Sequence, residues 1–316
     1  MQPFKNIRVI DLTHVIAGPF CSYQLSIMGA DVIKVEPPDN PDVTRAVGNE
    51  FPRGEEGMGY LFTAQNANKR AISVDIKSSE GRDILLDLTR NDDVFIENYR
   101  CGAMADRGLD YASVSAVNPE IIYCSLTGFG QGGPLGERTA YDNVIQAFSG
   151  LMGVTGDKDS APLKVGAPVL DYGTGIQAAY AIACALFQRS TTGKGQYIDV
   201  SMLDSALMLM SDKITLWHQK GRLPALTGNA SDSYAGYSCY ETREGKIMLG
   251  AYNRNQVRRL WQVLGDPEHG EAVAENQPRQ MTEHLATDTS RISELMMTRT
   301  AEEWEQIFNQ IGRAHV

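Results

Sequence analysis

Asp171 is the residue of this chain whose setting is most typical of covalent chemistry. It lies in residues 169–175, Val-Leu-Asp-Tyr-Gly-Thr-Gly, where a strand or loop enters a helix. A helix N-terminus favours the ionised form of a carboxylate, and Gly173 and Gly175 would let a bulky substrate approach. The functional interpretation is therefore a carboxylate nucleophile. The alternative, which the spacing alone favours, is an N-cap aspartate that accepts backbone N–H bonds.

Other glycine-rich segments do not form a recognisable phosphate site. Residues 128–133, Gly-Phe-Gly-Gln-Gly-Gly, match G-x-G-x-x-G after a strand, but Pro134 follows where a helix should open. No acidic residue closes a strand about 20 residues later, as the dinucleotide fingerprint requires. Gly193-Lys194-Gly195 lacks the spacing of a phosphate loop, and no G-x-S-x-G nucleophile elbow is present. These segments are predicted to be loops and turns.

The cysteines and histidines do not predict a metal site. No two of them have the spacing of metal ligands, and the five cysteines form no C-x-x-C pair. We therefore expect free thiols and no bound metal.

A set of basic residues near predicted strand ends has two possible roles. They are either solvated surface charges, or several of them converge on a phosphorylated ligand. The set comprises Lys34, Arg45, Lys69, Arg70, Lys77, Arg100 and Arg107.

Composition restricts the class of protein. The chain has 316 residues and a formal net charge of −10, which disfavours a nucleic-acid partner. No run of about 18 apolar residues could span a membrane, and the N-terminus lacks the pattern of a signal peptide. We expect a cytoplasmic enzyme that binds neither nucleic acid nor membrane.

The elements that must position these residues alternate along the first 200 residues. Apolar runs predict strands at 7–12, 31–36, 71–75, 94–97, 121–126 and 196–202. Between them, helices are predicted at 19–28, from the N-cap Ser78 onward, and at 171–189; another follows at 203–218. This order predicts an α/β domain with a mostly parallel sheet.

The remaining residues predict a smaller α+β domain. An antiparallel pair at 237–242 and 246–251 precedes helices at about 255–264, 289–298 and 301–311. We expect a large domain at 1–203, a linker helix at 204–224 and a small domain at 225–310. Residues 311–316 can be encoded by a common sequencing-adaptor string, so we expect this tail not to be natural protein.

Seven segments in order resemble the class III CoA-transferases, the CaiB/BaiF family. They are THVIAGP (13–19), GADVIKVEPP (29–38), NKRAISVDIK (68–77), ENYR (97–100), TGFGQGGP (127–134), LDYGTG (170–175) and TGKGQYIDVSMLD (192–204). The resemblance implies a Rossmann-like large domain and interlocked homodimers when the chain is full length. It also implies transfer of CoA from an acyl-CoA to a small carboxylic acid, with the CoA thioester as substrate and no tightly bound cofactor.

The same resemblance assigns roles to residues. Asp171 becomes the nucleophile, which forms an aspartyl anhydride and then an aspartyl-CoA thioester. The CoA contacts become His14, Ile16, Ala17, Val74, Asp75, Ile76, Lys77, Asn98, Tyr99, Arg100, Arg107, Tyr141 and Asp142. The chain departs from the family where Cys101 replaces a proline, and where Asp106 stands at an arginine position with Arg107 one residue later.

Two alternatives remain open. The related α-methylacyl-CoA racemases pair a histidine with the aspartate, but Tyr141 stands at that position and tyrosine is a weak base at neutral pH. Transfer is therefore favoured over racemisation. The second alternative is that this chain is an inactive fragment of a CoA-transferase, because family members continue past its end.

Overall fold

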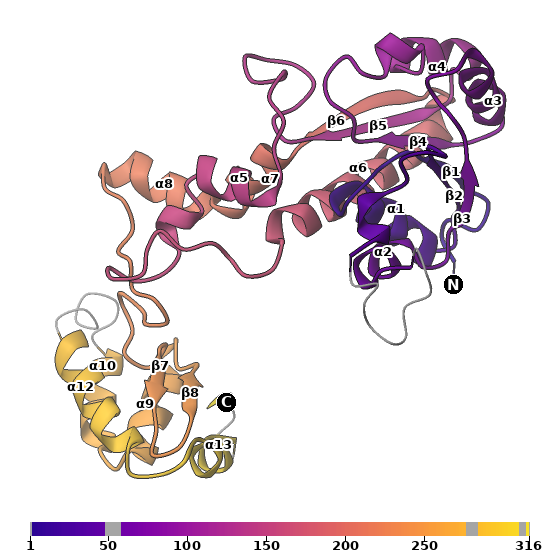
Figure 1. Cartoon of the computed structure of the whole chain (residues 1–316). Helices are drawn as coiled ribbons and strands as arrows, with labels where there is room; N and C mark the ends of the chain where they lie inside the picture. The colour runs from indigo at the N-terminus through magenta and orange to yellow at the C-terminus, as the bar shows by residue number, and fades with distance from the viewer. Residues whose placement is uncertain (1, 48–57, 276–283, 310–313, 316) are drawn as a thin grey trace. The chain divides into compact units, whose positions relative to one another are not determined.

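The protein is described by a computed structural model (Figure 1). The structure describes residues 2–47, 58–275, 284–309 and 314–315. They form two compact units, one of residues 1–152 and 164–222, the other of residues 153–163 and 223–316. Residues 204–222, expected to form a linker, group with the first unit, and residues 153–163 group with the second.

A parallel sheet forms the centre of the first unit. In the described residues it has six strands in the order β3-β2-β1-β4-β5-β6, and every neighbouring pair is parallel. This doubly wound order confirms the predicted α/β fold. The strands are β1 (Arg8–Asp11), β2 (Asp31–Glu36), β3 (Arg70–Ser73), β4 (Val94–Glu97), β5 (Ile122–Thr127) and β6 (Gln196–Ser201).

Helices cover both faces of this sheet (Figure 1). Val9 and Val94 point to the face covered by α1 (Ala17–Ile27) and α6 (Val169–Thr192). Their neighbours Ile10 and Phe95 point to the opposite face, with α3 (Ser79–Thr89) and α4 (Tyr111–Val117). Burial on both faces explains why the strands are nearly continuous apolar runs.

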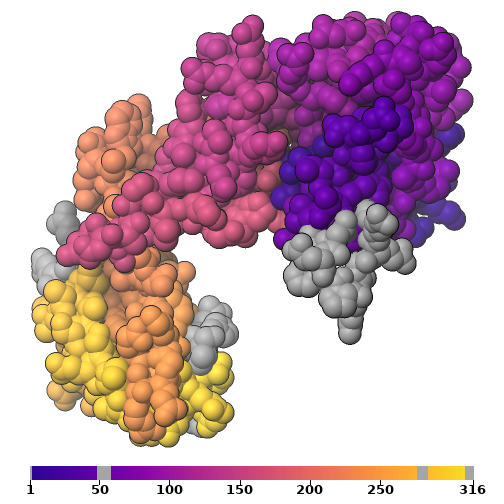
Figure 2. Space-filling view, in the orientation of Figure 1, coloured from indigo at the N-terminus to yellow at the C-terminus, as the bar shows by residue number. Residues whose placement is uncertain are grey.

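Shorter helices complete the first unit, and side chains fill the spaces between the ribbons (Figure 2). They are α2 (Tyr60–Asn66), α5 (Asp142–Phe148), α7 (Met202–Leu209) and α8 (Ser211–Lys220), with the 3₁₀ turns η1 (Val43–Arg45) and η2 (Ala105–Arg107); η3 (Met152–Val154) lies at the unit boundary. The single helix predicted at 203–218 is wrong, because the chain breaks at Met210 between α7 and α8. The predicted N-cap is confirmed, since the Ser78 hydroxyl accepts the Gly81 N–H at 3.0 Å.

The second unit combines a small antiparallel sheet with helices. The predicted strand pair is confirmed as β7 (Cys239–Glu241) and β8 (Lys246–Leu249), and β9 (Ala314–His315) pairs with β8. The helices are α9 (Arg254–Val263), α10 (Pro267–Glu275), α12 (Leu285–Met296) and α13 (Ala301–Asn309). Trp261 and Trp304 lie in its core. The boundary predicted at residue 311 lies outside the described residues.

Nowhere in the described part of the chain is a helix long and apolar enough to cross a membrane.

Candidate active site

The parallel sheet brings the segments that follow β1, β4 and β5 to one edge. In doubly wound sheets ligands bind at this edge, where the strand order reverses, which here is between β1 and β4. A cavity of about 460 Å³ lies there, and all its described lining residues belong to the first unit. The lining comprises residues 14–17, 98–101, 126–128, 136, 138–141 and 144, together with Asp171, Thr174 and Met202.

Asp171 lines this cavity from the first turn of α6. Helix α6 begins at Val169, so Asp171 is its third residue and the N-cap interpretation is wrong. Asp142 provides the cap instead, because its Oδ2 accepts the N–H of Leu170 at 2.8 Å and of Asp171 at 3.2 Å. The Asp171 side chain is therefore not used in capping and lies at the cavity.

The electrostatic environment of Asp171 differs from the expected one. Burial raises its pKa to about 7, the negative charge of Asp142 adds to this, and a hydrogen bond from the Ala17 N–H lowers it in part. The helix N-terminus does not keep Asp171 fully ionised, because burial disfavours the charged form, and Asp142 occupies two of the N–H groups and adds a like charge. Both protonation states of Asp171 are accessible near neutral pH.

Gly175 serves helix packing rather than substrate approach. A Cβ atom at this position would lie 2.6 Å from the Ala17 carbonyl oxygen of α1, which is shorter than any normal contact. Glycine therefore lets α1 and α6 approach closely. At Gly173 the nearest atom to such a Cβ is 3.8 Å away, on Leu209, so the expectation of open space is met there only.

Hydrogen bonds hold the loop between β1 and α1 in place. The Asn98 side chain accepts the His14 N–H at 2.9 Å and donates to the His14 carbonyl at 2.8 Å. The His14 Nε2 lies 2.9 Å from the Tyr99 hydroxyl. Burial and then the charge of Lys34 lower the pKa of His14 below its usual 6.5, so its imidazole is neutral at pH 7.

Some of the predicted site residues line the cavity and others do not. It is lined by His14, Ile16, Ala17, Asn98, Tyr99, Arg100, Tyr141 and Asp171. Its described lining does not include Val74, Asp75, Ile76, Lys77, Arg107 or Asp142.

The omitted residues have other positions in the structure. Val74 and Ile76 are buried in the core beside α3, and Asp142 caps α6. The Arg107 guanidinium lies 5.8 Å from the ring centroid of Tyr99 and donates to the Ala103 carbonyl. Their contact with CoA stays a prediction.

Several of the basic residues are used in ion pairs. Lys69 pairs with Asp11 at 3.0 Å, and the side chains of both are almost completely buried. Lys34 is also buried and lies 3.4 Å from Asp42. Neither lysine is a solvated surface charge, so that interpretation is wrong for them. Neither is among the described lining residues of the cavity, and convergence of several basic residues on a ligand stays a prediction.

Arg138 and Thr174 are polar lining residues that sequence reasoning missed. Arg138 lies in the loop between β5 and α5, well after the end of the strand, so its position gave no signal. Thr174 lies three residues after Asp171 on the same face of α6, a spacing that could have identified it. The Thr174 hydroxyl is buried and has no hydrogen-bond partner in the part of the chain that the structure describes.

The fold and the cavity define a doubly wound α/β protein with one carboxylate and two arginines, Arg100 and Arg138, among the described lining residues. The sequence matches the model of CoA-transferase family III over residues 4–314, and the chain belongs to that family. The resemblance predicted from the sequence is thereby confirmed. The match extends past residue 311, where the sequence analysis placed a boundary.

Proteins similar to this chain include CoA-transferases. The chain is 41% identical over 266 residues to the succinate–glutarate CoA-transferase of Agrobacterium fabrum, covering 83% of this chain and 66% of the relative. It is 38% identical over 268 residues to the succinyl-CoA:glutarate CoA-transferase of Homo sapiens, covering 85% of this chain and 60% of the relative. The chain thus spans less than two thirds of the length of these relatives.

A solved structure has the same fold. A CAIB/BAIF family protein from Brucella suis superposes with a TM-score of 0.84 at 33% identity, covering 99% of this chain and 83% of that one.

Among the described residues, no group of three or more His, Cys, Asp and Glu side chains is placed to hold a metal ion.

Proposed function

We propose that this protein transfers CoA from an acyl-CoA to a carboxylic acid, with Asp171 as the nucleophile. The observation that carries the proposal is the position of Asp171, the sole carboxylate among the described lining residues of the strand-end cavity. Asp171 is 9% exposed, which is enough to meet a substrate and little enough to limit access of water. Membership of CoA-transferase family III supports the same reaction.

In the first half-reaction, an Asp171 oxygen attacks the thioester carbonyl carbon. The carbon–sulfur bond breaks, which leaves a mixed anhydride on Asp171 and a CoA thiolate. The thiolate then attacks the aspartyl carbonyl of the anhydride and releases the first carboxylate. Asp171 now carries CoA as a thioester.

The second half-reaction reverses these steps with the acceptor. The acceptor carboxylate attacks the aspartyl thioester and regenerates an anhydride and the thiolate. The thiolate attacks the acyl carbonyl, which forms the new acyl-CoA and restores the Asp171 carboxylate. No water is consumed, so exclusion of water from the cavity protects both intermediates.

The surroundings of Asp171 support roles for its neighbours. The Ala17 N–H bonds the Asp171 carboxylate and can hold it in one orientation for attack. Arg100 and Arg138 line the cavity and have no ion-pair partner within the described residues. We propose that they bind the anionic groups of CoA or of the acyl acid.

The substrates that we propose to test first are small dicarboxylic acids and their CoA thioesters. Relatives at 41% and 38% identity are named for succinate and glutarate. A panel that starts with these acids and extends to monocarboxylic acids would identify the acid pair.

Trapping of the covalent intermediate tests the proposal. The intact protein is incubated with an acyl-CoA and then with hydroxylamine, which converts an activated aspartyl group into a hydroxamate. We expect the modification on the peptide that contains Asp171, with transfer lost by roughly 10⁴-fold in Asp171→Asn and the fold retained. Asp87→Asn, an exposed carboxylate on α3, serves as the matched control.

Two outcomes would contradict this function. One is transfer at nearly the wild-type rate by Asp171→Asn. The other is rapid exchange of the substrate α-proton in D₂O that Tyr141→Phe does not affect, because this would indicate an isomerase.

We also propose that the protein is a cytoplasmic homodimer. Ile176, Tyr180 and Phe187 lie on one face of α6 and are 55%, 71% and 77% exposed within the chain. An apolar stripe of this kind is typical of an interface, and a second copy is the partner we propose. A monomeric mass in light scattering of the intact protein would contradict it.

A further inference from the structure

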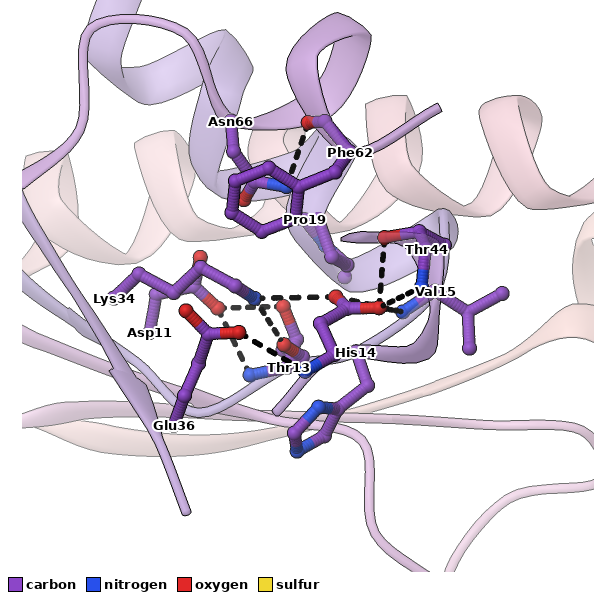
Figure 3. A network of polar contacts seen from close by, with 12 residues as sticks. Asp11, Thr13, His14, Val15, Pro19, Lys34, Glu36, Thr44, Phe62 and Asn66 are labelled. Atoms are coloured by element: carbon purple, nitrogen blue, oxygen red, sulfur yellow. Dashed lines mark hydrogen bonds and ion pairs between the residues drawn. The ribbon is translucent and has the colours of Figure 1, made fainter. Parts of the chain in front are cut away.

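A cluster of six charged residues, all buried except the partly exposed Arg45, lies at the loop that joins β1 to α1. Figure 3 labels Asp11, Lys34 and Glu36 among them. We call it the ionic cluster; it consists of the acids Asp11, Glu36 and Asp42 and the bases Lys34, Arg45 and Lys69. The three negative and three positive charges balance. A buried charge is costly unless it is paired, so the positions of these side chains are strongly coupled to one another.

The loop above the cluster contains a strained residue. Val15 has φ 73°, in the left-handed region that a β-branched side chain disfavours. Such a conformation persists only where its surroundings impose it. Val15 lies two residues before Ala17, and Val15, Ala17 and Asp171 line the same cavity.

The ionic cluster holds the chain on both sides of His14. The Lys34 ammonium donates to the Thr13 carbonyl at 2.6 Å. The Asp42 carboxylate accepts the Val15 N–H, with its two oxygens at 3.3 and 3.2 Å. Figure 3 shows these bonds converging on the turn at Val15.

Asp42 joins the strained residue to the rest of the cluster. Besides Val15 and Lys34, it accepts the N–H and the hydroxyl of Thr44, at 3.0 and 2.8 Å. Its own N–H donates to Glu36 at 3.0 Å. Asp42 is 1% exposed, so these contacts fix its carboxylate without competition from water.

We propose that Asp42 is a positioning residue for the reaction at Asp171. It holds Val15 in its left-handed conformation, and Val15 in turn sets the path of the chain that places Ile16 and Ala17 in the cavity lining with Asp171. Asp42 does not line the cavity and acts through the backbone of this loop. This inference rests on the proposed function.

A rescue experiment tests the proposal. Asp42→Asn weakens the acceptor for the Val15 N–H, and we expect single-turnover acylation of Asp171 to slow by about 10²-fold, the cost of misplacing a reacting group. Glycine adopts a positive φ without strain, so adding Val15→Gly should raise the acylation rate of Asp42→Asn by roughly tenfold. The melting temperature should recover only in part, because the strain at Val15 is relieved but Lys34 remains buried without its partner.

Thr44→Val is the matched control. It removes the hydroxyl bond to Asp42 and leaves the bond from the Val15 N–H in place. We expect a lower melting temperature and an unchanged acylation rate. An equal loss of rate in Thr44→Val, or no rescue by Val15→Gly, would overturn the proposal. If Asp42→Asn does not fold, recovery of folded protein in the double variant supports the proposal, and failure of both variants to fold overturns it.

Hydrogen exchange separates this inference from the proposed function. If the wild-type protein transfers no CoA, the proposed function fails, but exchange of the Val15 amide still reports the bond to Asp42. We expect this exchange to be about tenfold faster in Asp42→Asn. An unchanged exchange rate would overturn the inference by itself.

Discussion

The ionic cluster and the cavity are two charged regions within the same unit. They differ in whether their charged side chains form ion pairs with one another. In the cluster each acid lies beside a base, at distances of 2.6 to 3.4 Å for the ion pairs. In the cavity, Arg100 and Arg138 lack ion pairs within the described residues, and Asp171 is hydrogen-bonded to a backbone N–H.

The charges of the ionic cluster stabilise the fold, whereas the charges of the cavity are available to bind a ligand. A buried and balanced set gains from its own attractions and loses heavily when one member is removed. Cations without partners at a cavity remain able to bind an anion. The two regions should therefore respond differently to the same kind of substitution.

The largest effect on stability is expected for Lys69→Met. The substitution leaves Asp11 buried without its main partner, and breaking a buried pair costs about 3–5 kcal/mol. Burial alone would raise the pKa of Asp11, but the charges of Lys69 and Lys34 hold it below its usual range. Urea unfolding of the intact protein measures the loss.

Arg70→Gln is the control next to it in the chain. Arg70 pairs with Asp31 at 2.5 Å, but both side chains are well exposed, and such pairs contribute about 0–1 kcal/mol. If Lys69→Met costs no more than Arg70→Gln, the ionic cluster does not stabilise the fold as argued.

A smaller effect, on binding, is expected for Arg138→Gln. Loss of a charge-assisted bond to an anionic group should raise the KM for acyl-CoA by about tenfold. Stability should change by less than about 0.5 kcal/mol, because no buried partner is left behind. Arg138→Lys should retain part of the affinity. Steady-state kinetics measures the change in KM, and thermal unfolding measures the change in stability. A large loss of stability would mean that Arg138 stabilises the fold, as the residues of the ionic cluster do, and would contradict this prediction.

The smallest effect concerns pH. With the pKa of Asp171 raised to about 7, the reactive carboxylate increases roughly fourfold between pH 6.5 and 8, and acylation should rise accordingly. Between about pH 4 and 7, the Asp171 carboxyl is protonated in the folded state but ionised in the unfolded state. The stability contributed by Asp171 therefore falls as pH rises through this range. Asp142→Asn should move the rate profile to lower pH. A profile that is flat across this range would contradict the raised pKa.

The fold was largely predictable because its signals are local. Apolar runs such as 31–36 and 94–97 are buried on both faces, and the structure reproduces them as β2 and β4. The break between α7 and α8 was not predictable, because Met210 carries none of the usual signals of a helix end.

The site was predictable only in part, since its key contacts join distant residues. Asp171 was identified from its motif, but its cap comes from Asp142, 29 residues earlier. The partner of Lys69 is Asp11, 58 residues away, so the sequence alone could not distinguish a buried lysine from a surface one. Arg138 carried no signal because loops have no periodicity to reveal which side chains face a cavity.

The contact between Ala17 and α6 has a consequence for how such a site can change in evolution. The Ala17 carbonyl faces Gly175, and the Ala17 N–H faces Asp171, one helical turn away. Both contacts use main-chain atoms, which every amino acid except proline possesses. Evolution can therefore change the geometry at Asp171 through substitutions that move this stretch of backbone, such as a side chain at Gly175 or a change in the loop that Asp42 holds.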